Sequence, residues 1–222
     1  MGDVKTPRRG YHSQVRADAA LRTRRAIVAA ARELFLEVGY TAASLRAVAD
    51  LAGVARPTVT AVFGSKPALL RQLVDEALAG DDEPVPVARR PWFAPVLEAT
   101  DPQAVLDAYA GVCTLIGSRA AGIFEVVHRA AGDSPELTEL WATLVRNRRF
   151  GAEMVVRRAV ETGPVRDDVP AEHVIDSLWM YNDPGLYTAL IVDRGWPEAQ
   201  FTAWLAGQMR AAVLGLPDAG QP

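Results

Sequence analysis

The sequence predicts an all-α protein with a small N-terminal helix-turn-helix domain and a larger helical domain. Apolar residues recur with the helical period along most of the chain. No stretch shows the alternation of apolar and polar residues that is typical of strands separated by hairpin turns. Two short helical patterns joined by a Gly-containing turn lie near the N-terminus. The chain has 222 residues, 50% of them hydrophobic, which allows a substantial buried core.

The first predicted helix starts near Asp18 and is marked by one apolar stripe. Residues from Ile27 to Val38 fall at spacings of three and four, so they share one helix face. Gly39 follows, and glycine readily takes the left-handed conformation that ends a helix. Residues 1–15 mix Gly, Pro, Lys and Arg, and we expect them to be disordered.

Two short helices are predicted next, over residues 45–51 and 56–63. Ser44 can cap the first, and Gly53 ends it. Pro57 is tolerated in the second because the first turn of a helix has no intrahelical partner for its amide. A fourth helix, capped by Ser65, would extend to Leu78. The predicted packing residues of the pair are Leu45, Val48, Ala49, Val54, Val59 and Phe63, which leaves Arg56, Thr58, Thr60 and Ala61 facing outward.

The segment 80–95 is the predicted domain boundary, because it holds four prolines and an acidic run. The chain would then divide into a flexible basic arm (1–19), a helix-turn-helix domain (20–80) and a larger helical domain (81–222). Helices of the larger domain are predicted over residues 102–118, 120–131, 135–162, 170–180, 184–193 and 197–214.

Charge is distributed unevenly between the two parts. Residues 1–80 hold 12 Lys and Arg against 7 Asp and Glu, a net +5, and the remainder holds 12 against 20, a net −8. A basic head on an acidic body suggests that the head binds a polyanion. Chance clustering in an ordinary soluble protein is the alternative.

Several function classes are disfavoured. The single cysteine, Cys113, excludes an internal disulfide and a multi-cysteine metal cage. The three histidines are scattered, and the common metalloprotease, nucleotide-binding and hydrolase motifs are missing. We therefore expect no enzyme, no metal and no cofactor. No apolar run reaches about 18 residues and no secretory segment is evident, so we expect a cytoplasmic protein without membrane contact.

The motifs between Leu34 and Leu70 resemble the DNA-binding domain of the tetracycline-repressor (TetR) family. The sequence has LF…GY (Leu34 to Tyr40), then SLRAVADLAGV (Ser44 to Val54), then RPT…FGSK…LL (Arg56 to Leu70), all in register. The resemblance implies a three-helix domain whose third helix enters the major groove, followed by a ligand-sensing and dimerising body. It further implies a regulator of transcription that a small apolar or amphipathic ligand releases from a palindromic operator. Repressor and activator stay open as alternatives.

The resemblance assigns Lys66 to a phosphate contact, although a solvated lysine is the plainer interpretation. Thr41 and Ser44 could donate hydroxyl groups to phosphates, but Ser44 could equally be only a helix cap. At the start of the recognition helix, Arg56 could bind guanine in bidentate fashion. The remaining candidates for DNA binding are Arg46, which could be simply solvated, and Pro57, Thr58 and Thr60.

This chain departs from the family pattern in ways that predict fewer phosphate contacts. Many members carry Ser or Thr at the position of Ala55, and aromatic residues at those of Thr60 and Val62. The Arg-rich N-terminal arm could compensate by binding the minor groove or the DNA backbone. A disordered solubilising tail is the alternative.

In the body, the resemblance carries over as architecture only. The ligand would be an unidentified small molecule, and its candidate lining residues are Tyr109, Cys113, Phe124, His128, Trp141, Trp179, Tyr181 and Asn182, most of which could instead be ordinary core. The candidate homodimer interface comprises Leu186, Leu190, Trp196, Phe201, Trp204, Leu205 and Met209. An alternative function for the whole chain is a helical protein-interaction module that reads no specific DNA sequence.

Overall fold

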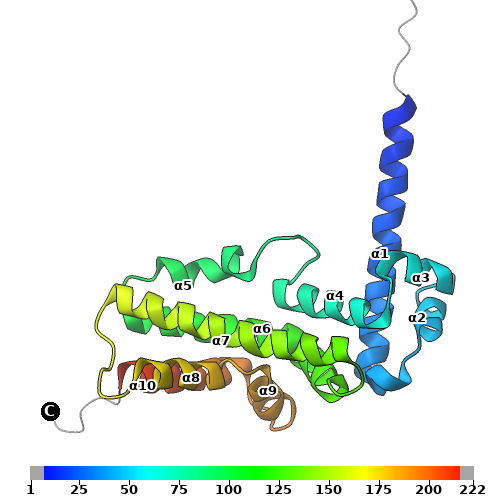
Figure 1. Ribbon diagram of the computed structural model, residues 1–222. Coiled ribbons are helices and arrows are strands. Elements are labelled where there is room, and N and C mark those ends of the chain that lie inside the picture. Colours follow the sequence, from blue (N-terminus) through cyan, green and yellow to red (C-terminus); the bar gives the residue numbers. More distant parts are fainter. Residues whose placement is uncertain (1–7, 216–222) are drawn as a thin grey trace, which may run out of the picture. The chain divides into compact units, whose positions relative to one another are not determined.

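The computed structural model describes residues 8–215, with the backbone alone for residues 8–13 and 15. All regular structure in this range is helical, which confirms the predicted all-α fold (Figure 1). The chain forms two compact units, an N-terminal unit, Met1–Leu73, and a C-terminal unit, Val74–Pro222.

The division between the units falls inside helix α4 (Lys66–Ala79), several residues before the predicted boundary at residue 80. Leu69 and Leu70 lie in the N-terminal unit, Val74 and Ala77 lie in the C-terminal unit, and all four side chains are buried. One continuous helix therefore contributes to two cores, which the proline-rich stretch after it did not indicate.

Helix α1 (Arg8–Ala42) is longer than expected, because residues 8–19 are helical instead of forming the predicted flexible arm. No glycine or proline interrupts residues 11–38, and the Ala and Arg residues near the start favour helix. The regular backbone breaks at Gly39, with φ 80° and ψ 164°, where the sequence predicted the end of the helix.

The core of the N-terminal unit forms where the apolar stripe of α1 meets α2 (Leu45–Leu51), which in turn packs against α3 (Arg56–Phe63). Short helices of this length are unstable alone and depend on such packing. The fully or nearly fully buried side chains of this unit include Ile27, Ala31, Phe35, Val48, Ala49, Val59, Leu69 and Leu70.

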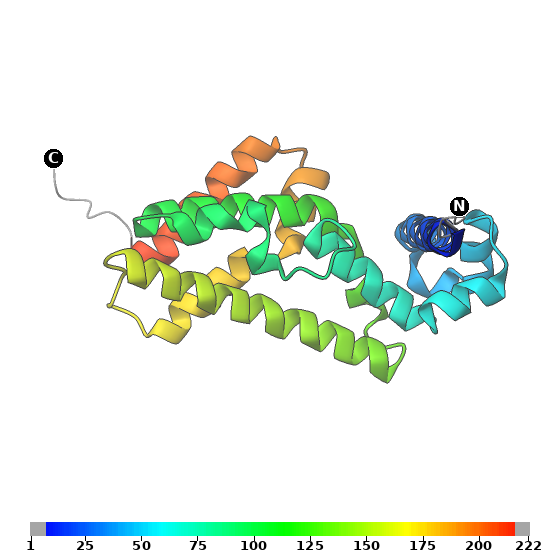
Figure 2. The same ribbon diagram turned by 90° about the horizontal axis from the view of Figure 1, so that it is seen from above.

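The C-terminal unit is built around helix α6 (Pro102–Ala130), which packs against α7 (Pro135–Thr162) and α10 (Glu198–Leu214). Helix α8 (Ala171–Tyr181) closes the arrangement, since it contacts both α7 and α10 (Figures 1 and 2). The smaller elements of this unit are the 3-10 turns η1 (Val87–Arg89) and η2 (Pro91–Phe93), α5 (Ala94–Glu98), α9 (Pro184–Tyr187) and the π-helical turn η3 (Thr188–Val192).

Helix α6 is continuous, whereas two helices had been predicted, over residues 102–118 and 120–131. Near the predicted break, Gly117 packs closely on α9: a Cβ there would lie 2.7 Å from the Tyr187 ring. Within the described part of the chain, α6 alone is long and apolar enough to cross a membrane, yet 56% of its most apolar window is buried. Its apolar character therefore belongs to the core of the C-terminal unit.

Candidate functional site

Helix α3 exposes most of its side chains to solvent around a single buried residue. Val59 is 1% exposed and anchors the helix, whereas Arg56, Pro57 and Thr60 are exposed and Thr58 is half-buried. A helix with one buried side and a short, exposed opposite side has the form needed to enter the major groove of DNA.

The two short helices differ in how they begin. Ser44 caps α2 by accepting a hydrogen bond of 3.0 Å from the amide of Ala47. Ala55 occupies the equivalent position of α3 in an extended conformation, and no side chain caps that helix. Pro57 has no amide hydrogen, and the Thr58 amide donates to the carbonyl oxygen of Ala55 at 2.8 Å, so the first turn of α3 relies on the backbone alone.

Lys66 opens α4 and reaches back to the end of α1. Its ammonium nitrogen lies 3.5 Å from the carbonyl oxygen of Thr41 and 4.1 Å from the centroid of the Tyr40 ring. The Phe35 ring lies 6.0 Å from the same nitrogen. Thr41 and Lys66, both predicted to contact phosphate, are thus brought together by the fold, and the lysine is held by aromatic faces.

Two further arginines of the N-terminal unit show contrasting surroundings. The Arg24 guanidinium lies 4.8 Å from the ring centroid of Phe63, so it holds the end of α3 against α1. Arg46, a predicted DNA contact, has a side chain 83% exposed and lies 3.8 Å from Asp50 one turn later. Such an exposed pair contributes little to stability, so Arg46 could exchange it for a phosphate.

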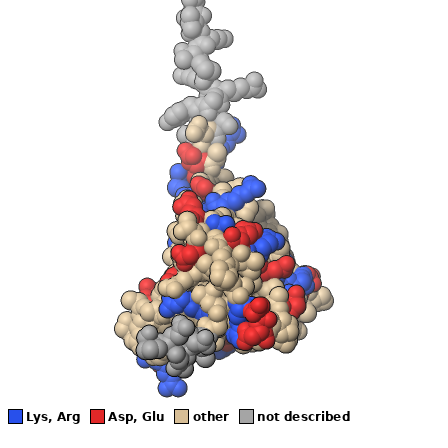
Figure 3. All heavy atoms as spheres, turned by 90° about the vertical axis from the view of Figure 1, so that its left-hand side faces the viewer, with Lys and Arg blue, Asp and Glu red and all other residues tan. Residues whose placement is uncertain are grey.

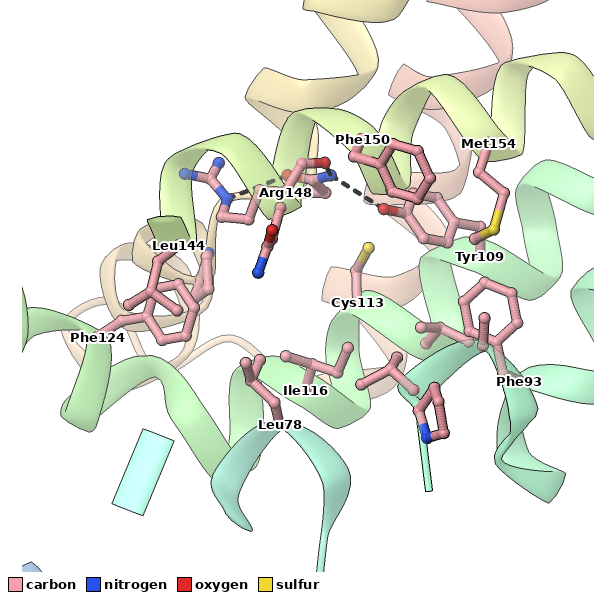
Figure 4. A pocket seen from close by; sticks show the side chains of 18 residues that line it. Leu78, Phe93, Tyr109, Cys113, Ile116, Phe124, Leu144, Arg148, Phe150 and Met154 are labelled. Atoms are coloured by element: carbon pink, nitrogen blue, oxygen red, sulfur yellow. Dashed lines mark hydrogen bonds between the residues drawn. The ribbon is translucent and has the colours of Figure 1, made fainter. Parts of the chain in front are cut away.

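A cavity of about 400 Å³ lies within the C-terminal unit (Figure 4). Tyr109 and Cys113 of α6 form one side, and Leu144 and Met154 of α7 form another. Phe150, also on α7, lines the cavity yet is 65% exposed, which indicates an opening there. The remaining lining residues are Leu78, Pro86, Val87, Ala88, Phe93, Val112, Ile116, Phe124, Asn147, Arg148, Gly151, Asn182 and Pro184.

A polar network follows one wall of this cavity. Asn182 donates hydrogen bonds of 3.0 Å to the hydroxyl of Tyr109 and to the carbonyl oxygen of Arg148. The Nε of Arg148 in turn donates to Asn182 Oδ1 at 3.2 Å (Figure 4). Asn182 stands in the break between α8 and α9, so this single amide connects α6, α7 and that break.

Burial shifts the pKa values of the groups at the wall. It raises the pKa of Tyr109 well above its usual value and that of Cys113 to about 12, so both groups are neutral near pH 7. Burial lowers the pKa of Arg148, although Asp183 opposes this shift by favouring the charged form. The Cys113 side chain is only half-buried because one side of it faces the cavity.

The predicted ligand-binding residues divide into two groups. Tyr109, Cys113, Phe124 and Asn182 line the cavity. The other four lie elsewhere: His128 stacks on Trp141 with ring centroids 4.5 Å apart, Trp179 lies beneath Arg148, and Tyr181 bonds Gln208.

Sequence reasoning missed the contribution of α7, including Asn147, Arg148, Phe150 and Met154. Their spacing of three and four residues would have placed them on one helix face. Neither that spacing nor their chemistry indicated that this face meets α6 across a cavity. Arg148 in particular is one of several arginines on α7 and has no distinguishing mark in the sequence.

The predicted dimer residues also divide. Phe201, Leu205 and Met209 are at most 2% exposed and belong to the core of the C-terminal unit, so they offer no surface to a second chain. Trp196 and Trp204 are partly exposed and contact each other, with ring centroids 6.0 Å apart. Leu186 and Leu190 are partly exposed, and Met180 and Val192, which had not been predicted, are more than half exposed.

On the face of the molecule drawn in Figure 3, basic and acidic side chains are interspersed with uncharged ones. The negative charge of the C-terminal part therefore forms no single acidic area on that face. No cluster of three metal-ligating side chains occurs among the described residues.

Comparison with protein families identifies the N-terminal unit. Residues 27–73 match the family described as bacterial regulatory proteins, tetR family. The matched segment contains α2, α3 and the start of α4, together with the apolar stripe of α1. No curated protein matches the chain.

Solved structures share the fold over nearly the whole chain. NalD, the secondary repressor of the MexAB-OprM multidrug efflux pump in Pseudomonas aeruginosa, is 20% identical with a TM-score of 0.65, covering 89% of this chain and 98% of its own. SmeT in complex with triclosan is 19% identical with a TM-score of 0.67, covering 89% and 93%. The fatty acid degradation regulator FadR from Bacillus halodurans is 17% identical with a TM-score of 0.62, covering 85% and 93%.

Proposed function

The chain belongs, through residues 27–73, to the tetR family of bacterial regulatory proteins, and we propose that it represses transcription as a ligand-released, dimeric operator-binding protein. The observation that carries this proposal is the exposed polar face of α3, held in place by buried Val59. The proposal assigns the protein to the bacterial cytoplasm and gives it no enzymatic role.

In this proposal α3 reads bases in the major groove and its neighbours hold the DNA backbone. Arg56, at the start of the helix, binds a guanine edge with two hydrogen bonds, and Thr58 and Thr60 add shorter contacts. Lys66 and Thr41 lie at one place on the surface and bind phosphate. Ser44 uses its oxygen as a cap, and its hydroxyl proton stays available for a second acceptor.

Dimerisation would use the partly exposed apolar side chains at the end of the chain. Trp196 and Trp204, with exposed Met180 and Val192 nearby in sequence, supply the aromatic and apolar area that stable interfaces favour. A two-fold dimer presents two copies of α3 to a palindromic operator. Light scattering at micromolar concentration measures the mass directly, and a monomer would contradict this part of the proposal.

The cavity of the C-terminal unit is the proposed effector site. Leu78, one of its lining residues, lies on α4, the same helix that begins at Lys66. A small apolar or amphipathic ligand that prefers one position of α4 would lower DNA affinity by its differential binding energy. Solved proteins of this fold are named as a repressor and as a triclosan complex, which supports such a role without identifying the ligand.

Selection from random duplex DNA by the full-length protein tests the proposal. A regulator enriches one palindromic site, and its affinity for that site exceeds that for random DNA by about 10³-fold or more. Arg56→Ala should reduce this preference at one base pair by about 1–3 kcal/mol, whereas Arg71→Ala, at an exposed arginine of α4 outside the site, should leave it intact. Failure to enrich any sequence would favour the helical protein-interaction module instead.

A further inference from the structure

The cavity of the C-terminal unit has an almost uncharged wall. Of the 18 side chains that line it, Arg148 alone carries a formal charge near pH 7 (Figure 4). Its polar atoms are otherwise the Tyr109 hydroxyl, the Cys113 thiol and the amides of Asn147 and Asn182. The preferred charge of a ligand therefore depends on whether another group of the protein neutralises the charge of Arg148.

The charge of Arg148 is already balanced within the protein. Nη1 lies 2.8 Å from a carboxylate oxygen of Asp183, and Nη2 donates to the carbonyl oxygen of Trp179 at 3.0 Å. The guanidinium is also 5.5 Å from the centroid of the Trp179 ring. The Arg148 side chain is 11% exposed and that of Asp183 is 44% exposed, so the pair is shielded from water on the arginine side.

A ligand of either charge would disturb this balance. A carboxylate would leave its hydration shell to compete with Asp183 for a cation that is already paired. An ammonium group would enter an apolar cavity whose one charged wall residue is positive. A neutral ligand avoids both desolvation penalties and gains from burying apolar surface.

Tyr109 supplies a polar contact suited to such a ligand. Its hydroxyl oxygen accepts from Asn182, which leaves the hydroxyl proton for another acceptor, and the Cys113 thiol is its neighbour on the cavity wall (Figure 4). Sulfur is a weak acceptor. An oxygen atom on a ligand would replace it with a stronger one.

We propose that this cavity selects an uncharged, largely apolar molecule that carries an oxygen acceptor for the Tyr109 hydroxyl, because the Asp183 carboxylate has already neutralised Arg148. The inference rests on the proposed function only in treating this cavity as the effector site. The inference assigns the chemical class of the ligand, and it names Asp183 as the residue that determines this class.

The test is isothermal titration calorimetry of the full-length protein, without DNA, against matched compounds at about pH 7. Two series share one skeleton each: 2-naphthylmethanol, 2-naphthoate and 2-naphthylmethylammonium, and 1-decanol, decanoate and decylammonium. In at least one series the alcohol should bind tighter than both ions by at least about tenfold, which corresponds to about 1.4 kcal/mol. Binding of an ion as tight as or tighter than that of the alcohol in both series, or no binding by both alcohols, overturns the proposal.

Asp183→Asn provides a second readout. Asp183 caps α9 by accepting from the Gly185 amide at 2.7 Å, and asparagine is an equally good cap, so the variant removes charge while keeping the local fold. With Arg148 uncompensated, affinity for the carboxylate should rise at least about tenfold and that for the alcohol should change little. An unchanged preference in this variant contradicts the role given to Asp183.

Asp176→Asn is the matched control. Asp176 pairs with Arg149 at 3.0 Å, next to Arg148 in sequence, but neither residue lines the cavity. This variant should bind all compounds as the native protein does. Since no DNA is present, these results stand apart from whether an operator is found, so failure of the ligand class and failure of the DNA-binding proposal can be told apart.

Discussion

The ammonium group of Lys66 lies 4.1 Å from the centroid of the Tyr40 ring, so the first residue of α4 is held against the end of α1. The carbonyl oxygen of Thr41, 3.5 Å away, holds the same group from a second direction. This arrangement limits the movement of a cation that is proposed to bind phosphate. Mutation can separate the effect of the charge of Lys66 on DNA binding from the effect of its fixed position.

Lys66→Ala should weaken binding to specific and random DNA by similar factors, since phosphate contacts carry no sequence information. The slope of log affinity against log salt should fall by about 0.9 for each lysine lost. Tyr40→Leu keeps the charge and loses the ring, so the salt slope should stay while affinity falls. Fluorescence anisotropy across salt concentrations measures both quantities. Tyr40→Phe, which keeps the aromatic face, should behave as the native protein, and an unchanged slope in Lys66→Ala would remove this lysine from the site.

The missing cap of α3 predicts opposite effects at two equivalent positions. Ala55 has φ −73° and ψ 141°, which suits a capping serine, so Ala55→Ser should stabilise α3 by about 1 kcal/mol. Ser44→Ala removes an existing cap and should destabilise α2 by about 1 kcal/mol. Hydrogen exchange of peptides spanning residues 44–63 should then slow about fivefold in the first variant and quicken about fivefold in the second. Equal exchange rates in all three proteins would show that these caps do not limit local opening.

Two glycines of α6 make a matched pair for packing. A Cβ at Gly117 would lie 2.7 Å from the Tyr187 ring, whereas a Cβ at Gly111 would meet no atom within 4 Å. Gly117→Ala should therefore destabilise the C-terminal unit by about 1–3 kcal/mol. Gly111→Ala should stabilise it by up to about 1 kcal/mol, because alanine favours helix over glycine. All five tryptophans lie in this unit, so urea unfolding followed by tryptophan fluorescence reports on it. Two variants of equal stability would argue against the close packing of α6 on Tyr187.

Cys113 predicts a specific loss of stability in alkali. Burial raises the pKa of its thiol from 9.0 to about 12, so the unfolded chain ionises first as the pH rises. The contribution of the neutral thiol to the free energy of unfolding is complete below about pH 9, and it is lost progressively towards about pH 12. Cys113→Ala lacks this group, so its urea midpoint should fall less between pH 8 and pH 10.5 than that of the native protein. The native thiol should also react with iodoacetamide far more slowly than the thiol of the urea-unfolded chain. A parallel fall in both proteins would contradict the assigned shift.

Much of the N-terminal unit could be predicted because its signals are local. Gly39 ends a regular helix, Ser44 caps the next one, and Ala55 leaves α3 uncapped, each of which depends on backbone geometry within a few residues. Thr60, which follows buried Val59, is exposed as the helical period predicts, whereas Arg56, three residues before Val59, is exposed at the first position of the helix. The roles of these residues towards DNA stay predictions.

The C-terminal unit was predicted less completely, because periodicity shows that a face is buried without showing what covers it. Phe201, Leu205 and Met209 were assigned to a dimer surface, yet the core of their own chain contains them. Separate helices were predicted over residues 102–118 and 120–131, yet α6 continues through both, and Gly117 allows its close contact with Tyr187.

The sequence by itself determined the helical class, the helix ends around residues 39–65 and the exposed face of α3, because these features depend on side-chain period and on neighbours within one turn. Only the tertiary structure decided that Arg148 faces a cavity, that Asp183 compensates its charge and that α4 contributes to both cores. Those relationships join residues tens of positions apart, and the free energy of packing that selects among such pairings is a property of the whole core.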